Sequence, residues 1–574
     1  MDEGGRHRHP RLVHGRPPKR DAGKRPQDDR VRDRSRSGLR ELQHLLSGTR
    51  HHPLRTRDRI GPAAVAVVSR ANGAGVPARR LFVSRRDPRA AAGGVSAVLL
   101  PPVLHHAPPD PHALVRGTRA VLRRRDDAAL DGEDEGEVRL PHRKLEDRAG
   151  KPERLLTRRK GLLVFAAALA LRLSFLGLSR TETVLTGDQL DYDQIAHHLA
   201  TGGGFAYNPG VPTSIRAPVY PYALAAVYKI FGRNYGRVRV LQALLGAGVC
   251  WLLFWLVRYE FDDRSALAAA GFAVLYPVFM HYETRLLSES LAVFLTLACV
   301  PGLIAYAKTG RLAPLAASAA ITAAAALTRP GIMLLPLAAA PFLLARRSGG
   351  LRAAVLYFGV YAGLMLPWSL RNQHHFGHWA ICTRGPGMGL YTTSLMIEGM
   401  PYREAFNKAE ILVHEPRYAE PTEPTHGSHP YAELEARYKA MALPVIKAHP
   451  FAYAWIVAKR LPRFWISSHS SVFGVDRPLS EYRAEGRWGP VLFRFLLLGL
   501  HAALCALAAL GIFVWRERWK TLWPLAVVPA YFTIHIGFDL IPRYGLPAFP
   551  LLFANAGVAA VFLFDLWRAR AKES

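Results

Sequence analysis

Long apolar segments recur along the chain after residue 160. The first, GLLVFAAALALRLSFLGL at 161–178, is interrupted only by Arg172 and one serine. Further segments follow at 237–257, 265–281, 286–306, 312–328, 331–345, 353–370, 490–515, 521–538 and 544–567. Because a helix of about 20 apolar residues crosses a bilayer, the pattern predicts an all-α polytopic membrane protein with about 10 transmembrane helices. The segments 312–328 and 331–345 are short and alanine-rich, so one re-entrant hairpin is an alternative for that pair.

Basic residues lie beside alternate ends of these segments, at 158–160, 258–264, 308–311, 346–352, 516–520 and 568–572. Such residues mark the cytoplasmic ends of membrane helices. We therefore expect a multi-pass protein of the cell membrane with both termini in the cytoplasm. Two long loops, 179–236 and 371–489, are then extracytoplasmic. Within the second, AHPFAYAWIVAKRLPRFWI at 448–466 is typical of an amphipathic helix at the membrane interface.

The N-terminal arm has a different composition. The first 160 residues hold 37 of the 75 Lys and Arg, 20 of the 44 Asp and Glu, and a single aromatic residue, Phe82. So little apolar surface cannot offset the chain entropy, so we expect disorder over 1–155 and a membrane domain over 156–574. The start of the chain lacks the pattern of a signal peptide. The arm is dispensable or artefactual, a cytoplasmic tail, or a binder of anionic lipid or nucleic acid. Interspersed acids and missing aromatics argue against nucleic acid as a partner.

Aspartates gather directly after the first apolar segment, in TGDQLDYDQIAHHLATGGGF at 186–205. A helix over 188–200 places Asp188 and Asp191 on one face with Tyr192, whereas Asp193 projects elsewhere. Replacement of Asp193 by Asn is therefore expected to be nearly silent. Helix capping is an alternative role for Asp188 and Asp191, because carboxylates are favoured at helix N-termini.

Three arginines lie at predicted outer ends of membrane segments, where the charge pattern otherwise sends cations inward. They are Arg216 in SIRAPVYPY, Arg371 in LPWSLRNQHHFG and Arg543 in DLIPRYGLP. Since a guanidinium binds phosphate through two parallel hydrogen bonds, these arginines are candidates for a lipid-linked phosphate. Snorkelling, or pairing with Asp539 or Glu283, is the structural alternative.

Taken in order, these segments resemble bacterial GT-C glycosyltransferases, in particular the family of protein O-mannosyltransferases and lipid A aminoarabinose transferases. The resemblance covers about 161–567. The motifs that carry it are Asp188-Gln-Leu-Asp191-Tyr192, Arg216-Ala-Pro218, Ser288-Glu289, Thr328-Arg329-Pro330, Pro367-Trp-x-x-Arg371-Asn372 and Arg543-Tyr544-x-x-Pro547.

The resemblance implies a GT-C-like helical bundle. It also implies transfer of a sugar, with inversion, from a polyprenyl-phosphate donor to an extracytoplasmic protein, lipid or envelope glycan. A carboxylate must take the acceptor's proton, and arginines can stabilise the phosphate that leaves. By this resemblance Asp188 is the base, Asp191 and Glu289 are further acids, Arg216, Arg371 and Arg543 bind the donor phosphate, and Tyr192 and Tyr544 line the pocket. Pairing with Arg285, one helical turn earlier, is the structural alternative for Glu289.

The chain departs from its relatives where some of them bind a metal. Gln189 and Ile215 stand where relatives often carry glutamate, and adjacent histidines such as His197 and His198 do not easily face one site. We therefore expect no metal and assign no cofactor. A transporter or flippase for a lipid-linked or anionic substrate is the alternative function, because charged groups at the ends of membrane helices also line transport paths.

Overall fold

The described part of the chain is almost entirely helical. In this computed structural model the described residues are 151–179, 185–346, 348–383, 385–415, 430–535 and 541–573. Across these ranges the strands form one small antiparallel sheet, β1 (Ala206–Asn208) with β2 (Val211–Pro212). The predicted all-α architecture is therefore confirmed. Of the predicted arm, residues 1–150 lie outside the described ranges, while 151–155 form the start of a helix whose membrane-spanning part is Thr157–Leu178.

Six helices among the described residues are long and apolar enough to cross a membrane. They are Thr157–Leu178 within α4 (Lys151–Leu178), α7 (Tyr235–Glu260), α10 (Glu289–Thr309), α13 (Gly350–Phe376), α19 (Trp488–Val514), and Pro542–Lys572, which comprises η6 (Pro542–Ala548) and most of α22 (Phe549–Glu573). Each coincides with a predicted segment. The chain is an integral membrane protein.

The other predicted segments are also helical, but each is shorter or broken. They correspond to α8 (Asp263–Leu275) with α9 (Pro277–Glu283), α11 (Leu312–Thr328), η1 (Pro330–Ile332) with α12 (Leu335–Leu344), and α20 (Trp519–Leu522) with α21 (Pro524–His535). Helix α11 packs on α10 and α13, whereas α12 packs on α13 and α21. The two short alanine-rich segments therefore form separate helices that both pack on α13 and differ in their other main neighbour, α10 or α21.

The bend between α8 and α9 has a local cause. The two helices meet at 51°, and Pro277, the first residue of α9, has no backbone N–H to donate to the preceding turn. The carbonyl of Ala273, which that N–H would have reached, accepts a hydrogen bond of 3.4 Å from Arg172 Nη2 instead. Arg172 of α4 thus satisfies the backbone group that the proline leaves free.

Arg172 also forms a buried ion pair. Its Nε lies 3.1 Å from Glu283 Oε1, and both side chains are almost fully buried. A Cβ at Gly246 of α7 would lie 2.0 Å from this carboxylate oxygen, so glycine makes the room for the pair. Glu283, named above as a possible partner of the outer arginines, is paired with an arginine of the membrane core instead.

Small residues allow the membrane helices to approach closely. A Cβ at Gly511 of α19 would lie 2.0 Å from the carbonyl oxygen of Asn555 in α22. The Asn555 side chain is fully buried and fully used: Oδ1 accepts from Trp515 Nε1 at 2.7 Å, and Nδ2 donates to the carbonyls of Leu525 and Leu551 at 2.9 and 2.8 Å. This amide ties α19, α21 and α22 together in an apolar core.

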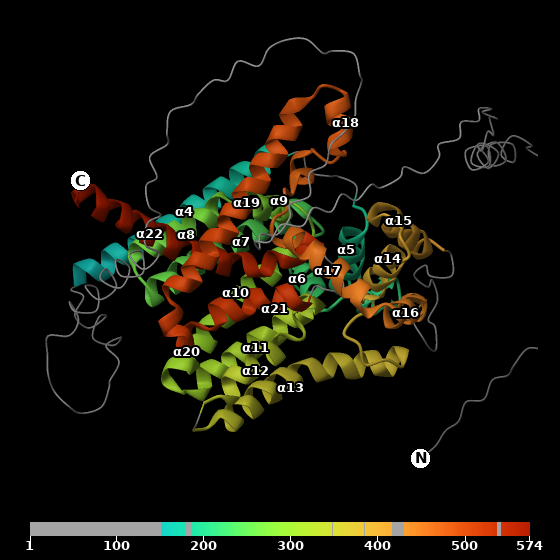
Figure 1. The fold of residues 1–574 in the computed structure, drawn as a ribbon. Coiled ribbons are helices and arrows are strands. Elements are labelled where there is room, and N and C mark those ends of the chain that lie inside the picture. Colours follow the sequence, from blue (N-terminus) through green and yellow to red (C-terminus); the bar gives the residue numbers. More distant parts are fainter. Residues whose placement is uncertain are drawn as a thin grey trace, which may run out of the picture. The chain divides into compact units, whose positions relative to one another are not determined.

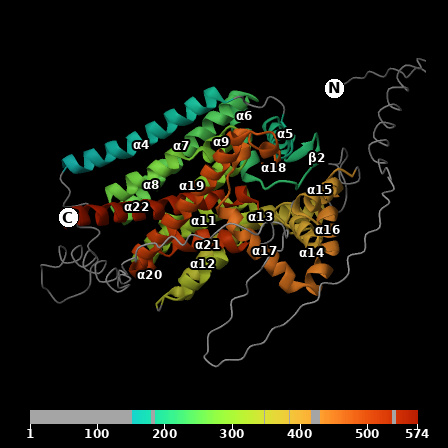
Figure 2. The ribbon, with the colours of Figure 1, turned by 45° about the horizontal axis from the view of Figure 1, so that its top comes forward.

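The remaining helices gather at one end of the bundle. They are α5 (Asp188–Ala200), α6 (Val219–Phe231), α14 (Gly387–Ile397), α15 (Tyr402–Val413), α16 (Pro430–Ala448), α17 (Pro450–Trp465) and α18 (Leu479–Ala484). Figures 1 and 2 both show α5, α14, α15 and α16 at one end, and the start of α4 and the C-terminal end of α22 at the other. This arrangement agrees with the predicted placement of both long loops on one side.

The predicted amphipathic helix over 448–466 corresponds to α17. It follows α16 at a bend of 104° and exposes Phe451 and Trp455, whose exposed fractions are 89% and 61%. Large exposed aromatics on a basic helix suit the headgroup level of a bilayer. The helix is confirmed, and its contact with the interface stays a prediction.

Candidate functional site

Asp188 is the first residue of α5. Gly187, which precedes it, has a φ of 53°, a left-handed conformation that glycine adopts without strain. Gly187 occupies the N-cap position, so Asp188 is the first helical residue and not the cap. The Asp188 carboxylate contacts two arginines.

Arg216, from the segment between β2 and α6, joins the two aspartates at the start of α5. Its Nη2 lies 2.5 Å from Asp188 Oδ1 and 2.6 Å from Asp191 Oδ2, and its Nε lies 3.0 Å from Asp191 Oδ2. The guanidinium also lies 5.1 Å from the centre of the Tyr192 ring. Burial alone would lower the pKa of Arg216, but Asp188 and Asp191 outweigh it and raise that pKa well above its usual value. Arg216 therefore stays charged.

Arg543 of η6 links Asp188 to Glu289, the first residue of α10. Arg543 Nη2 forms a close ion pair with Asp188 Oδ2, and Arg543 Nε lies 3.1 Å from Glu289 Oε1. The second contact is an ion pair without a hydrogen bond, because neither of its two atoms has a hydrogen-bond partner among the described residues. Glu289 is 1% exposed, so its charge depends on such neighbours.

Arg329, in the motif Thr328-Arg329-Pro330 at the C-terminal end of α11, joins the network although no role was predicted for it. Its Nη1 lies 2.9 Å from Glu289 Oε1, and its guanidinium lies 4.8 Å from the centre of the Tyr544 ring. The signal was present, since Arg329 is a further arginine at a predicted outer end of an apolar segment.

The site is therefore a network in which charges of opposite sign alternate. Its carboxylates are Asp188, Asp191 and Glu289, and its arginines are Arg216, Arg329 and Arg543. The structure brings together residues of α5, α10, α11, η6 and the loop before α6. Full ionisation leaves these six groups with no net charge, so an anionic substrate competes with carboxylates that already neutralise the arginines.

The connection between α9 and α10 places Ser288 and Glu289, and it is held by buried polar side chains. The hydroxyl of Tyr192 donates to Ser288 Oγ at 3.2 Å, and Gln189 Oε1 accepts from the N–H of Leu286 at 3.1 Å. Gln242 Nε2 of α7 donates to two carbonyls of the same connection at 2.9 and 2.7 Å. Burial raises the pKa of Tyr192, so its hydroxyl stays neutral. Gln189 thus uses its amide to position the site.

Arg371 differs from the other two predicted arginines. Its Nη1 donates to the carbonyl of Thr213 at 2.7 Å, and its Nη2 donates to the carbonyl of Phe205 at 3.2 Å. Its guanidinium also lies 4.8 Å from the ring centre of Trp368. Within the described ranges no carboxylate is recorded as its partner, so its contacts fix the β1–β2 segment against α13.

Asp193 faces away from this network, as the helical spacing predicts, but it has partners of its own. Its carboxylate is buried and accepts from the hydroxyls of Tyr228 and Tyr235 at 2.7 and 3.2 Å. Arg233 forms a close ion pair with it, and a hydrogen bond to Asp193 raises the pKa of Arg233. Asp193 therefore connects α5 with α6 and the start of α7.

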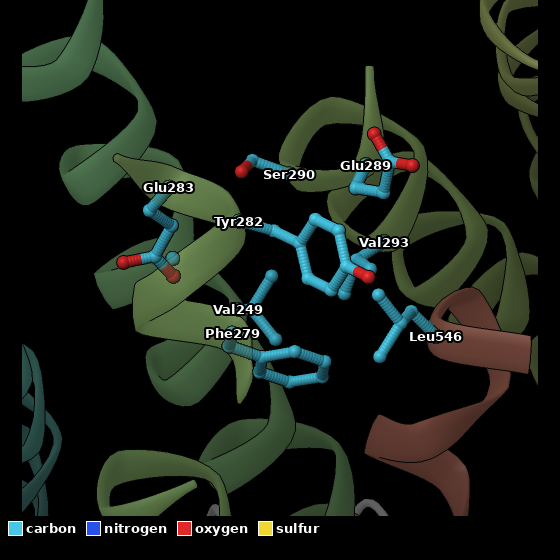
Figure 3. A pocket seen from close by; sticks show the side chains of 9 residues that line it. Val249, Phe279, Tyr282, Glu283, Glu289, Ser290, Val293 and Leu546 are labelled. Carbon is cyan, nitrogen blue, oxygen red and sulfur yellow. The ribbon is translucent and has the colours of Figure 1, made fainter. Parts of the chain in front are cut away.

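A small cavity lies against Glu289. Its lining is mainly apolar and comprises Gly246, Val249, Phe279, Tyr282, Glu283, Ser290, Val293 and Leu546 beside Glu289 (Figure 3). Figure 3 shows Glu283 and Glu289 on opposite sides of the Tyr282 ring. The space open to the centre of a water molecule is about 10 Å³, enough for about one water. A sugar does not fit there. The most exposed side chains of the network are those of Arg543 and Asp188, at 28% and 21%.

Among the described residues, no group of three or more His, Cys, Asp or Glu side chains has the spacing to hold a metal ion. The cations in contact with Asp188, Asp191 and Glu289 are arginines.

Comparison with known proteins locates the family resemblance. Residues 215–369 match the family model described as dolichyl-phosphate-mannose-protein mannosyltransferase. The matched segment includes Arg216, Glu289 and Arg329, whereas Asp188 and Arg543 lie outside it. The expected resemblance is confirmed over this segment. No curated protein sequence matches the chain.

Solved structures with a similar arrangement include the archaeal oligosaccharyltransferase AglB from Archaeoglobus fulgidus, in complex with an inhibitory peptide and a dolichol-phosphate. It is 13% identical with a TM-score of 0.43, over 73% of this chain and 52% of that one. ArnT from Cupriavidus metallidurans bound to undecaprenyl phosphate is 15% identical with a TM-score of 0.31, over 71% of this chain and 78% of that one. The chain spans about half the length of the archaeal structure that it matches.

Proposed function

We propose that the chain is an integral membrane glycosyltransferase that moves a sugar from a polyprenyl-phosphate donor to an extracytoplasmic acceptor, with inversion at the anomeric carbon. The observation that carries the proposal is the joint contact of Asp188 with Arg216 and Arg543. It brings a carboxylate, a group that can accept a proton, next to two guanidinium groups, which are suited to bind phosphate. The match of residues 215–369 to a mannosyltransferase family supports the same reaction class.

In the proposed reaction Asp188 acts as the general base. Its carboxylate takes the proton of the acceptor hydroxyl while the hydroxyl oxygen attacks the anomeric carbon of the donor. The bond from that carbon to the phosphate oxygen breaks, and the phosphate leaves with the electron pair. A positioned base contributes roughly 10²- to 10⁴-fold to the rate of such a step.

Arg216 and Arg543 stabilise the charge that develops on the leaving phosphate. Both are fixed by carboxylates before the substrate arrives, so little reorganisation accompanies the reaction. Asp191 and Glu289 hold these arginines, and Tyr192 and Tyr544 flank the same network. Arg371 contacts the donor phosphate only if it releases the carbonyls of Phe205 and Thr213.

The same end of the bundle carries the two long loops. With both termini in the cytoplasm, the network lies at the extracytoplasmic ends of the membrane helices. A polyprenyl chain then lies along lipid-facing helix surfaces, with its phosphate at the depth of the arginines.

The proposal is tested with purified full-length protein in lipid nanodiscs. Polyprenyl-phosphate sugars carrying different radiolabelled hexoses or pentoses are supplied with envelope extract, and both labelled product and free polyprenyl phosphate are measured. We expect one donor to be consumed with equal formation of both products. Asp188→Asn should lower the rate constant roughly 10²-fold or more, because the amide does not accept the proton.

Two controls make the outcome specific. Glu481→Gln, at an exposed position of α18, should keep the wild-type rate, and the melting temperature of Asp188→Asn should show that it is folded. Transfer by Asp188→Asn at the wild-type rate would exclude Asp188 as the base. Movement of intact donor across the membrane without cleavage would establish the transporter alternative instead.

A further inference from the structure

Arg543 uses two different edges of its guanidinium for two carboxylates. Its Nε lies 3.1 Å from Glu289 Oε1, and its Nη2 contacts Asp188 Oδ2. Asp188 likewise uses its two carboxylate oxygens for two different arginines, because its other oxygen, Oδ1, lies 2.5 Å from Arg216 Nη2. No two of these three contacts share an atom. The contact between Arg543 Nη2 and Asp188 Oδ2 can therefore break while the other two remain.

That contact is also the most accessible one in the network. The side chains of Asp188 and Arg543 are 21% and 28% exposed, against 10% for Arg216 and 2% for Glu289. Glu289 thus holds Arg543 on the buried side, while the pair of Arg543 with Asp188 lies on the exposed side of the network. Phosphate and carboxylate oxygens satisfy a guanidinium in the same geometry, so a donor phosphate competes with Asp188 for Arg543.

We infer that the donor phosphate displaces Asp188 Oδ2 from Arg543 Nη2, and that this exchange releases the oxygen that acts as base. The inference rests on the proposed function and adds a binding order to it. Before the donor binds, Asp188 Oδ2 is occupied by Arg543. Afterwards Arg216 still orients Asp188 through Oδ1, while Oδ2 exchanges Arg543 for the acceptor hydroxyl. Glu289 is a positioning residue, because it keeps Arg543 in place during the exchange.

The exchange links the contact between Asp188 and Arg543 to the binding of the donor phosphate, and each affects the other. Competition for one group is thermodynamically reciprocal, so whatever weakens the hold of Asp188 on Arg543 strengthens the hold of the phosphate. The product, free polyprenyl phosphate, carries the same chemical group and is the probe for a binding experiment that does not depend on activity.

The test measures the dissociation constant of polyprenyl phosphate for the full-length protein in nanodiscs. Asp188→Asn should bind the probe about tenfold more tightly than wild type, the size expected for the loss of one competing hydrogen bond between charged groups. Asp193→Asn is the matched control. It removes the same charge from the same helix, but Asp193 is bound to Arg233, outside the network, so it should leave the dissociation constant unchanged. In an Arg543→Gln background the gain from Asp188→Asn should disappear.

The outcomes separate this inference from the proposed function. Equal tightening by Asp188→Asn and Asp193→Asn would show that the effect is general charge repulsion and would overturn the exchange. A gain that persists without Arg543, or no gain in Asp188→Asn while wild type binds the probe, would overturn it too and leave the glycosyltransferase proposal standing. If the wild-type protein binds no polyprenyl phosphate, both the exchange and the glycosyltransferase proposal are contradicted.

Discussion

Asp193→Asn should destabilise the protein while leaving the transfer step intact. The wild-type carboxylate is 1% exposed and accepts hydrogen bonds from Arg233, Tyr228 and Tyr235. Each carboxylate oxygen accepts one hydrogen bond from Arg233 and one from a tyrosine hydroxyl. An asparagine has the same shape but no charge, and its NH₂ group cannot accept from a donor. The hydrogen bond from Arg233 to that position is therefore lost together with the ion pair, whereas the tyrosine hydroxyl can rotate and accept from the NH₂ group. This replaces the expectation, drawn from helical spacing alone, that the substitution is nearly silent.

The expected loss in the free energy of unfolding depends on how Arg233 is solvated after the substitution. Losing one charge-assisted hydrogen bond costs roughly 1.5–3 kcal/mol. Arg233 is 34% exposed on its side chain, so water can solvate its charge and the larger penalty for a stranded buried charge does not apply. We therefore expect the free energy of unfolding to fall by about 2 kcal/mol, near the middle of that range.

The assay compares unfolding in detergent for wild type, Asp193→Asn and Glu410→Gln, an exposed acid on α15 that serves as control. Asp193→Asn should unfold at lower temperature than both, and its rate of transfer at low temperature should stay within a few-fold of wild type. An unchanged melting temperature would show that the Asp193 contacts contribute nothing to stability. Loss of transfer from a protein that melts normally would place Asp193 in the chemistry.

Three further predictions concern topology, the arm and pH. In a cysteine-free background, single cysteines near Asn407 and Arg311 should be labelled from the outer and inner side respectively; the reverse result would put the network on the cytoplasmic face. A chain starting near Leu155 should insert into the membrane and transfer sugar like the full chain, and inactivity after normal insertion would give the arm a function. Burial and the neighbouring His501 lower the pKa of His469 to about 3. The unfolded chain, in which the pKa of this histidine is about 6.5, therefore binds a proton more readily than the folded one. The stability that neutral His469 contributes is present above pH 6.5 and is lost as the pH falls toward 3. His469→Asn, which keeps an acceptable residue at the positive φ of 44°, should unfold with a weaker pH dependence between pH 7 and 4; an unchanged dependence would contradict this reasoning.

The hydrophobic pattern predicted the positions of the membrane helices well, because each lipid-facing helix must be apolar over a length set by the bilayer. It did not predict how helices break. The bend between α8 and α9 depends on Pro277 together with Arg172 of another helix, and a pattern along one segment carries no information about a donor from elsewhere. The closeness of α19 and α22 likewise depends on Gly511 facing the backbone of Asn555.

Local spacing predicted the candidate site in part. It placed Asp188 and Asp191 on one face of a helix, and both contact Arg216. It gave no role to Gln242, because a buried glutamine in an apolar segment has no pattern that reveals which backbone groups it satisfies. It also left Arg329 aside, although Arg329 shares with Arg216 the feature that singled out the outer arginines.

An arginine at the outer end of a membrane segment supports a narrower prediction than phosphate binding. An arginine placed against the charge pattern of the membrane must be compensated, so its position predicts that it is bound, but does not say to what. Arg543 finds its partner Asp188 355 residues away, and Arg371 finds backbone carbonyls. Only the packing of the bundle decides between these outcomes, because it determines which helix ends meet. An arginine held by a carboxylate can exchange it for a phosphate of like charge, whereas one held by carbonyls must leave those polar groups unpaired. On this ground Arg543 is better suited than Arg371 to receive the donor.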